Sequence, residues 1–411
     1  MKILERKNIL ILGFTLLVVM LGYGMIQPIL PFLITSLGAG GRDLGMLTSV
    51  YAAMQLVFAP IWGSLSDRVG RKPILMVGVL GYAAAMFVFG LTTRIWMLYL
   101  ARTFSGVLSS AALPTAMAYI SDNLPEKERG GAMGQLGAAV GLGVVLGPML
   151  GGLLSTDSLS MPFFIGSGLA LVALLLVYLL LPESHGAPAR TSSAAKPANF
   201  WRWGPLKQIL FGPTGVLMLL IFILSFGMTN FQGIVGLYVV DKFAFDTRQV
   251  GAIWMVIGSV MILGQGVLTG PLTKRLGDVT VIRLGLFVGA AGFGSLLLAN
   301  GFGLFLVATG FFTLAVALIG PAMNSYLSAF GGVHQGALMG LNTAFASLGR
   351  VIGPLWAGFI FDVNIAFPFI SGMVTLILGS IFSLVGLKKR AAINPSVLQA
   401  KDKFDTKTGL P

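Results

Sequence analysis

The chain contains no cysteine, only two histidines and few charged residues for its length of 411. Without cysteine, neither a disulfide nor a thiolate metal site can form. Charged residues make up 10% of the chain, against about 25% in soluble domains, which leaves too little polar surface for a soluble protein of this size. No phosphate-cradling GxxxxGK[ST] segment and no buried pair of acids occur, so we expect no enzyme, no cofactor, no metal site and no ATP-driven pump.

Long apolar runs take the place of these features, since 56% of the residues are apolar. A helix that crosses a membrane needs roughly 20 mostly apolar residues. The runs, divided where Gly- and Asn-rich turns interrupt them, predict an all-α integral membrane protein with twelve transmembrane helices in two six-helix bundles. The predicted spans are 9–34, 44–65, 74–93, 95–120, 131–154, 162–181, 212–240, 249–272, 280–299, 302–328, 337–361 and 367–387.

The basic residues are unevenly distributed between the predicted loops. If the N-terminus lies in the cytoplasm, 21 Lys and Arg residues fall in cytoplasmic segments and four in outer loops, namely Arg42, Arg94, Lys242 and Arg248. Short loops rich in Lys and Arg remain in the cytoplasm, so we expect both termini there. The net charge of +13 then reflects topology and contacts with anionic lipid, and we expect no nucleic-acid binding.

The second half of the chain repeats parts of the first at an offset of 206–207 residues. Gly147-Pro148 recurs as Gly353-Pro354, and Pro162-Phe163 recurs further along at the same offset. Transporters are commonly built from such repeats, with the substrate site near the middle of the membrane between the halves. We expect the following division: a bundle at 1–181, a cytoplasmic linker at 182–211, a bundle at 212–387 and a cytoplasmic tail at 388–411.

The loop after the second span carries the segment GSLSDRVGRK, which begins at Gly63. Gly63 and Gly70 permit a sharp reversal of the chain. The segment resembles the loop motif of the major facilitator superfamily. This resemblance implies that Asp67 meets the start of the eleventh span when the protein is open to the outside, and that Arg71 pairs with Asp122. The alternative is that these charges only set the topology.

Three further motifs resemble those of twelve-span drug:proton antiporters. They are Leu21-Gly22 with Pro28 and Pro31 in the first span, Arg102-Thr-Phe-Ser-Gly106 in the fourth, and the glycine-rich run from Gly141 to Gly152 in the fifth. Small residues let helices approach closely, so we expect the fifth span to pack on the opposite half and slide against it. The residues expected to do so are Gly143, Gly147, Pro148 and Gly151.

Segments of the second half narrow the resemblance to quinolone and multidrug efflux pumps of Gram-positive bacteria. They are Ile223–Gly227, Gln335–Leu355 and Phe361-Asp362-Val363. The resemblance implies a monomer in the bacterial plasma membrane that exports small amphipathic compounds, driven by inward proton flow.

The sequence departs from these pumps in its acidic residues, because none of the 14 lies in the middle of a span. Proton-driven pumps usually titrate an intramembrane carboxylate. At the two positions where the resemblance implies one, this chain has Gln232 and Ala317. Proton coupling would therefore depend on Asp67, Asp122 or Arg102. For Arg102 the alternative is a purely structural role.

The candidate substrate cavity is predicted from polar residues within the spans, since polar groups are costly against lipid. Each of them has hydrogen bonding between helices as its alternative role. Arg350 is either a buried arginine bonded to helix carbonyls or a cavity cation that binds an anionic group. The predicted cavity residues are Gln27, Tyr51, Gln55, Asn230, Gln232, Asn324, Asn342 and Arg350.

The sequence thus predicts a secondary active transporter that exports amphipathic drugs or metabolites by alternating access. One alternative, suggested by the two intramembrane arginines, is an exporter of anionic metabolites or a flippase of anionic lipid. Another is a membrane sensor or scaffold that has a transporter fold but does not transport.

Overall fold

A computed structural model of the chain describes residues 3–184, 213–328 and 335–387. Most of the predicted linker at 182–211 and the whole predicted tail at 388–411 therefore lie outside the described residues. The first bundle contains α1 (Ile3–Ser36), α2 (Gly41–Val69), α3 (Arg71–Gly90), α4 (Ile95–Ser109), α5 (Ala112–Asn123), α6 (Glu126–Leu154) and α7 (Met161–Leu180). The second contains α9 (Pro213–Phe243), α10 (Thr247–Leu263), the π-helical turn η1 (Gly264–Leu268), α11 (Thr269–Leu276), α12 (Asp278–Leu298), α13 (Phe302–Ser328), α14 (Gln335–Phe361) and α15 (Phe367–Gly386).

The predicted all-α membrane fold is confirmed. Within the described residues, 11 helices are long and apolar enough to cross a membrane. They coincide with all the predicted spans except the fourth. The first of them continues through Pro28 and Pro31 without a break, as expected where packed neighbours satisfy the carbonyls that proline frees.

The fourth span is not one helix, as predicted, but two, α4 and α5. At the break, the Ala111 N–H donates to the Leu108 carbonyl (3.2 Å). The Val107 carbonyl accepts instead from Trp62 Nε1 (2.6 Å) and from Ser110 Oγ (2.7 Å). Because side chains from α2 and from the break itself satisfy this backbone group, the interruption is tolerated inside the membrane.

The eighth span also differs from the single regular helix that was predicted, because η1 separates α10 from α11. A π turn accommodates one extra residue within a helix and is frequent at functional sites. Thr269 Oγ1 donates to the Gly264 carbonyl across this turn (2.8 Å). The turn places Gln265 on the wall of the cavity described below.

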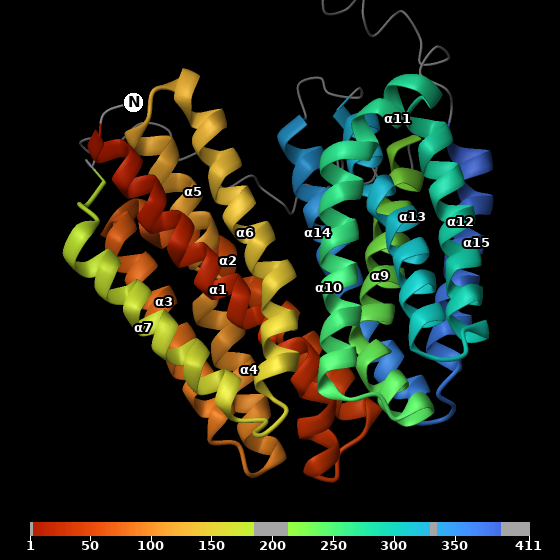
Figure 1. The fold of residues 1–411 in the computed structure, drawn as a ribbon. Helices are drawn as coiled ribbons and strands as arrows, with labels where there is room; N and C mark the ends of the chain where they lie inside the picture. The colour runs from red at the N-terminus through yellow and green to blue at the C-terminus, as the bar shows by residue number, and fades with distance from the viewer. Residues whose placement is uncertain (1–2, 185–212, 329–334, 388–411) are drawn as a thin grey trace, which may run out of the picture.

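Two helix crossings form the most extensive contacts between the bundles, α2 with α14 and α6 with α10 (Figure 1). Glycine is required at both. A Cβ at Gly358 would lie 2.2 Å from the Gly41 carbonyl oxygen, and one at Gly152 would lie 2.5 Å from the Thr247 carbonyl oxygen. Gly152 and Gly358 are 206 positions apart (358 − 152), so the two crossings repeat at the offset seen in the sequence.

Both crossings lie at the same end of the molecule. There α2 and α10 begin and α6 and α14 end, and Figure 1 shows this end opposite the N-terminus. We call it the far face and the other end the N-terminal face. The helices of the two bundles splay apart toward the N-terminal face (Figure 1).

The glycine-rich run of α6 packs differently from the prediction. Gly143, Gly147 and Gly151 lie against α1 of their own bundle, where added Cβ atoms would come within 2.3–2.7 Å of α1 atoms. The opposite bundle is contacted by Gly152 and by the Pro148 carbonyl, which would lie 2.7 Å from a Cβ at Gly251. The predicted close packing on the opposite half is therefore wrong for these three glycines, because they occupy the other side of the helix.

Candidate functional site

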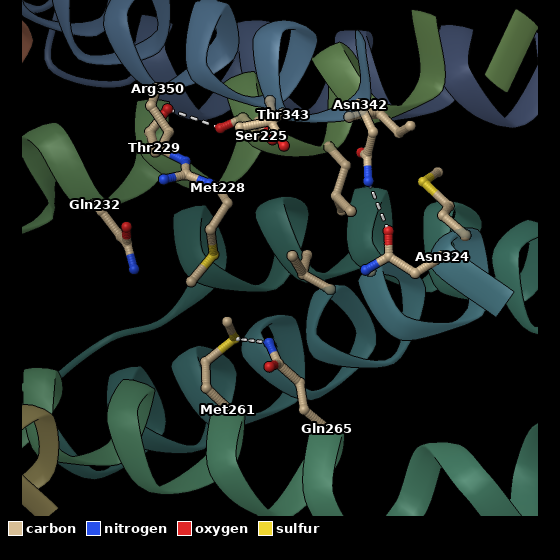
Figure 2. Close-up of a pocket in the computed structure, with 16 residues that line it drawn as sticks. Ser225, Met228, Thr229, Gln232, Met261, Gln265, Asn324, Asn342, Thr343 and Arg350 are labelled. Carbon is tan, nitrogen blue, oxygen red and sulfur yellow. Dashed lines mark hydrogen bonds between the residues drawn. The ribbon is translucent and has the colours of Figure 1, made fainter. Parts of the chain in front are cut away.

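A cavity of about 400 Å³ lies within the second bundle, between α9, α10 with η1, α13 and α14 (Figure 2). Its volume falls in the range of about 300–1,000 Å³ typical of small-molecule sites. The α9 residues that line it recur at helical spacing, so one side of this helix forms a wall. The lining consists of Ile221, Leu224, Ser225, Met228, Thr229, Gln232, Met261, Gln265, Val316, Gly320, Met323, Asn324, Asn342, Thr343, Ala346 and Arg350.

Four side-chain amides line this cavity. Gln232, Asn324 and Asn342 were predicted there, and Gln265 was not. Asn342 Nδ2 donates to Asn324 Oδ1 (2.8 Å), which connects α14 to α13. Amides both donate and accept hydrogen bonds, so this set can match many ligand groups without adding charge.

Among the described residues that line the cavity, Arg350 is the only charged one. Its side chain is exposed in the cavity, and within the described residues its guanidinium makes no ion pair and no hydrogen bond to a helix carbonyl. The neighbouring glycines fix its position: a Cβ at Gly349 would lie 2.6 Å from Ser225 Cβ, and one at Gly353 would lie 2.3 Å from Thr229 Oγ1. This close packing of α14 on α9 directs Arg350 toward the cavity.

Much of the remaining cavity wall is apolar and can adapt its shape. Met228, Met261 and Met323 contribute three thioethers from three helices, beside Leu224 and Val316. Methionine has three rotatable bonds and adapts to irregular shapes. Such a wall suits a site that accepts apolar groups of different outlines.

Other predicted cavity residues lie elsewhere. Asn230 is fully buried, and its Nδ2 donates to the Pro368 carbonyl (2.7 Å), so it connects α9 to the start of α15. In the first bundle Gln55 Nε2 donates to the Tyr51 hydroxyl (2.8 Å), and the Tyr51 ring stacks on Tyr23. Gln27 is half-buried on α1. The structure does not bring these residues to the wall of the cavity in the second bundle.

Arg102 is 1% exposed and lies among aromatic rings. Its guanidinium carbon is 5.5 Å from the Tyr51 ring centroid and 5.6 Å from that of Phe89. Within the described residues, Nε and Nη2 have no hydrogen-bond partner. An arginine at the bilayer centre costs about 2.5–3.5 kcal/mol on insertion scales, and cation–π contacts offset part of that cost.

The loop motif forms a charged cluster at the N-terminal face. Arg71 pairs with Asp67 through Nη1 (2.5 Å) and with Asp122 through Nε (2.8 Å), so the predicted Arg71–Asp122 pair is confirmed. In the described part of the structure, the partner of Asp67 is Arg71 of its own bundle. Gly70 forms the turn with φ 114°, whereas Gly63 lies inside α2 rather than at a reversal.

Glu183 completes this cluster and was not predicted. Its Oε1 accepts from the backbone N–H groups of Arg71 (2.9 Å) and Lys72 (3.1 Å). A carboxylate is favourable at a helix N-terminus, so Glu183 stabilises the start of α3. Its position directly after the sixth span was the available indication.

A second unpredicted carboxylate, Asp362, connects the bundles at the far face. Asp362 at the end of α14 accepts from the backbone N–H groups of Gly41 (2.8 Å) and Arg42 (3.1 Å) at the start of α2. Arg42 also lies over the Phe359 ring, 4.8 Å from its centroid. We call this contact of Asp362 with the α2 N-terminus the far-face latch.

The repeat shows why the latch is needed. In the second bundle α10 carries its own N-cap, Asp246, whose side chain accepts from the Gln249 N–H (2.8 Å). At the equivalent position of the first bundle (246 − 206) the chain has Gly40, which provides no side-chain cap. The α2 N-terminus therefore receives its cap from the opposite bundle.

Known proteins resemble the chain over nearly its full length. The sequence pattern of the Major Facilitator Superfamily matches residues 12–268 and 217–406. Multidrug resistance protein 2 of Bacillus subtilis (strain 168) is 32% identical over 397 residues, which cover 95% of this chain and 98% of that protein. Quinolone resistance protein NorA of Staphylococcus aureus (strain N315) is 28% identical over 390 residues, covering 94% of this chain and 98% of NorA.

A solved structure shares the fold. A bacterial homologue of the human lysosomal transporter Spinster, in an inward-facing and unoccupied conformation, superposes with a TM-score of 0.78 at 15% sequence identity. The match covers 94% of this chain and 97% of that one.

Proposed function

The chain belongs to the Major Facilitator Superfamily, and we propose that it is a secondary transporter that exports amphipathic drugs or metabolites by alternating access. The observation that carries the proposal is the cavity of about 400 Å³, lined by amides and methionines, in the second of two bundles that meet at one face. The full-length similarity to multidrug and quinolone resistance proteins supports export of drugs.

We propose that the N-terminal face is the cytoplasmic side of a bacterial plasma membrane, and that the protein acts as a monomer. The excess of Lys and Arg in the loops of that face supports this orientation. In this orientation the structure corresponds to the inward-open state, in which a substrate reaches the cavity from the cytoplasm.

Export then requires the bundles to rock about the cavity. The far-face latch and the two glycine crossings separate, while the N-terminal face closes. Asp67, which pairs with Arg71 in this structure, would exchange that partner for the start of α14 in the closed arrangement. Each set of contacts stabilises one state, so the two states differ by a few hydrogen bonds and ion pairs rather than by a change of fold.

Inward proton flow is the proposed driving force. None of the described residues that line the cavity is Asp or Glu, so we place the titrating group elsewhere. The cluster of Asp67, Arg71 and Asp122 is the candidate, because protonation of either carboxylate would weaken contacts that belong to one state. Arg102 is the second candidate, placed between the cluster and the far face on α4.

Dye export from whole cells tests the proposal. Cells expressing the chain and cells lacking it are loaded with an amphipathic dye, and efflux is followed with and without a protonophore. We expect faster efflux in expressing cells and loss of that difference with the protonophore. Equal efflux from both cell types would overturn the export function, and indifference to the protonophore would overturn proton coupling alone.

A further inference from the structure

We propose that the cavity selects amphipathic compounds that carry one anionic group, such as a carboxylate, and that Arg350 is the residue that binds this group. The inference rests on the proposed export function and names its substrate class.

The charge of the cavity wall supports this selectivity. In the part of the chain that the structure describes, Arg350 is the one charged residue of this wall, and the other polar groups are neutral amides and hydroxyls. Charges interact more strongly in a weakly polar protein interior than in water. A cationic compound in this cavity would be repelled by Arg350 with no carboxylate to compensate, whereas an anion would supply the missing counter-charge.

The guanidinium is also free to bind. Within the described residues it has no ion pair and no hydrogen bond. The planar guanidinium presents parallel N–H donors that match the two oxygens of a carboxylate. Met228, Thr229 and Gln232 of α9 line the same cavity as Arg350 (Figure 2). The Gln232 amide offers a further N–H donor to an anion held there.

The guanidinium of Arg350 and the thioether of Met261 come from different walls of the cavity. Arg350 projects from α14 beside α9, while Met261 and Gln265 lie on the opposite wall formed by α10 and η1 (Figure 2). A ligand with its anionic end at Arg350 would extend its apolar body toward the methionines. The cavity therefore fits the two ends of an amphipathic anion in one orientation.

Arg102 provides an internal comparison. It is also an intramembrane arginine, but it is 1% exposed and enclosed by the rings of Tyr51 and Phe89. Arg350 lines a cavity that a ligand can enter. Only Arg350 combines a positive charge with access, which makes it the determinant of specificity.

The proposal is tested by the binding of three probes that share a dansyl group and differ in charge. The purified full-length protein in nanodiscs of uncharged lipid is titrated with dansylglycine, which is anionic, dansylglycinamide, which is neutral, and N-(2-aminoethyl)dansylamide, which is cationic. Because hydrogen bonds between charged partners are stronger than those to a neutral group, we expect dansylglycine to bind about tenfold more tightly than the amide, and the amine to bind most weakly.

Three variants assign this preference to Arg350. Arg350→Gln should remove the preference for the anion, and Arg350→Lys should retain most of it. Arg94→Gln, which removes a positive charge from the exposed loop between α3 and α4, should leave the order of affinities unchanged. If Arg350→Gln does not yield folded protein, the order for the unmodified chain and for Arg350→Lys decides.

The outcomes separate this inference from the proposed function. Equal affinity for the three probes, or tighter binding of the cation, overturns anion selectivity even if cells export dye. An anion preference that persists in Arg350→Gln overturns the role of Arg350. Absence of export in the dye assay, with anion binding intact, overturns the proposed function and leaves the binding site in place.

Discussion

Asp362→Asn should shift the protein toward the state that is open at the far face. The substitution keeps the size of the side chain but removes its charge and leaves one oxygen to accept from the two N–H groups at the start of α2, which now lie 2.8 and 3.1 Å away. An N-cap is worth about 0.5–2 kcal/mol, and a charge at a helix N-terminus about 0.3–1 kcal/mol. We expect a loss of about 1 kcal/mol from the inward-open state, which changes the ratio of the two states about fivefold.

Distances between spin labels can measure this shift, because the chain has no cysteine of its own. Labels on Thr156→Cys and Asn364→Cys would report the separation of the bundles at the far face. Asp246→Asn is the matched control, since it makes the same change in a capping residue whose partner, Gln249, lies within the same bundle. We expect a larger population at long distance for Asp362→Asn and an unchanged distribution for Asp246→Asn. Superimposable distributions for Asp362→Asn and the parent protein would refute the latch.

Three further substitutions test other parts of the structure. Gly358→Ala would place a methyl group 2.2 Å from a backbone carbonyl of α2. Because overpacking costs about 1–3 kcal/mol, export should fall about tenfold. The control Gly168→Ala, with open space around it, should have no effect in the same efflux assay. In Gly70→Ala the new alanine must adopt φ 114°, which should lower the stability of the protein in detergent by about 1–3 kcal/mol. Gly63→Ala, inside α2, should raise this stability by about 0.5–1 kcal/mol. The reverse order would contradict the assignment of the turn to Gly70. Asp122→Asn removes one carboxylate from the cluster at the N-terminal face and should lower the melting temperature slightly, by an amount that shrinks in high salt; an effect independent of salt would point to packing instead.

The transmembrane helices could be predicted because a segment spans a membrane when its run of apolar residues is long enough. The break between α4 and α5 and the π-helical turn η1 could not be predicted from the sequence. The break after α4 depends on Trp62 of α2 reaching the Val107 carbonyl, and η1 depends on Thr269 reaching the Gly264 carbonyl. Both are tertiary or local backbone contacts that leave no trace in hydropathy.

The cavity was predicted in part for a similar reason. Polar side chains within membrane spans need polar surroundings, and four residues were expected in the cavity for this reason. The structure places all four on the lining of one cavity: Gln232, Asn324, Asn342 and Arg350. Asn230 was included on the same argument, yet it bonds to a carbonyl of α15. A helix turns about 200° over two residues, so Asn230 and Gln232 could not both face the cavity, and helical spacing could have excluded one of them.

Neither hydropathy nor motif resemblance predicted the capping roles of two carboxylates. Glu183 and Asp362 act on backbone N–H groups of helices distant in sequence, and such partners become visible only in three dimensions. For Asp362 the repeat held a clue, because Asp246 has no acidic counterpart at Gly40.

Transport by the purified protein tests the central claim most directly. The full-length chain is reconstituted into liposomes, a proton gradient with an acidic interior is imposed, and uptake of dansylglycine is measured against protein-free liposomes and against liposomes without the gradient. Proton-driven export predicts accumulation that requires both the protein and the gradient. Uptake equal to that of protein-free liposomes, both for dansylglycine and for the neutral amide and cationic amine used in its place, would contradict the assignment as an exporter of amphipathic compounds.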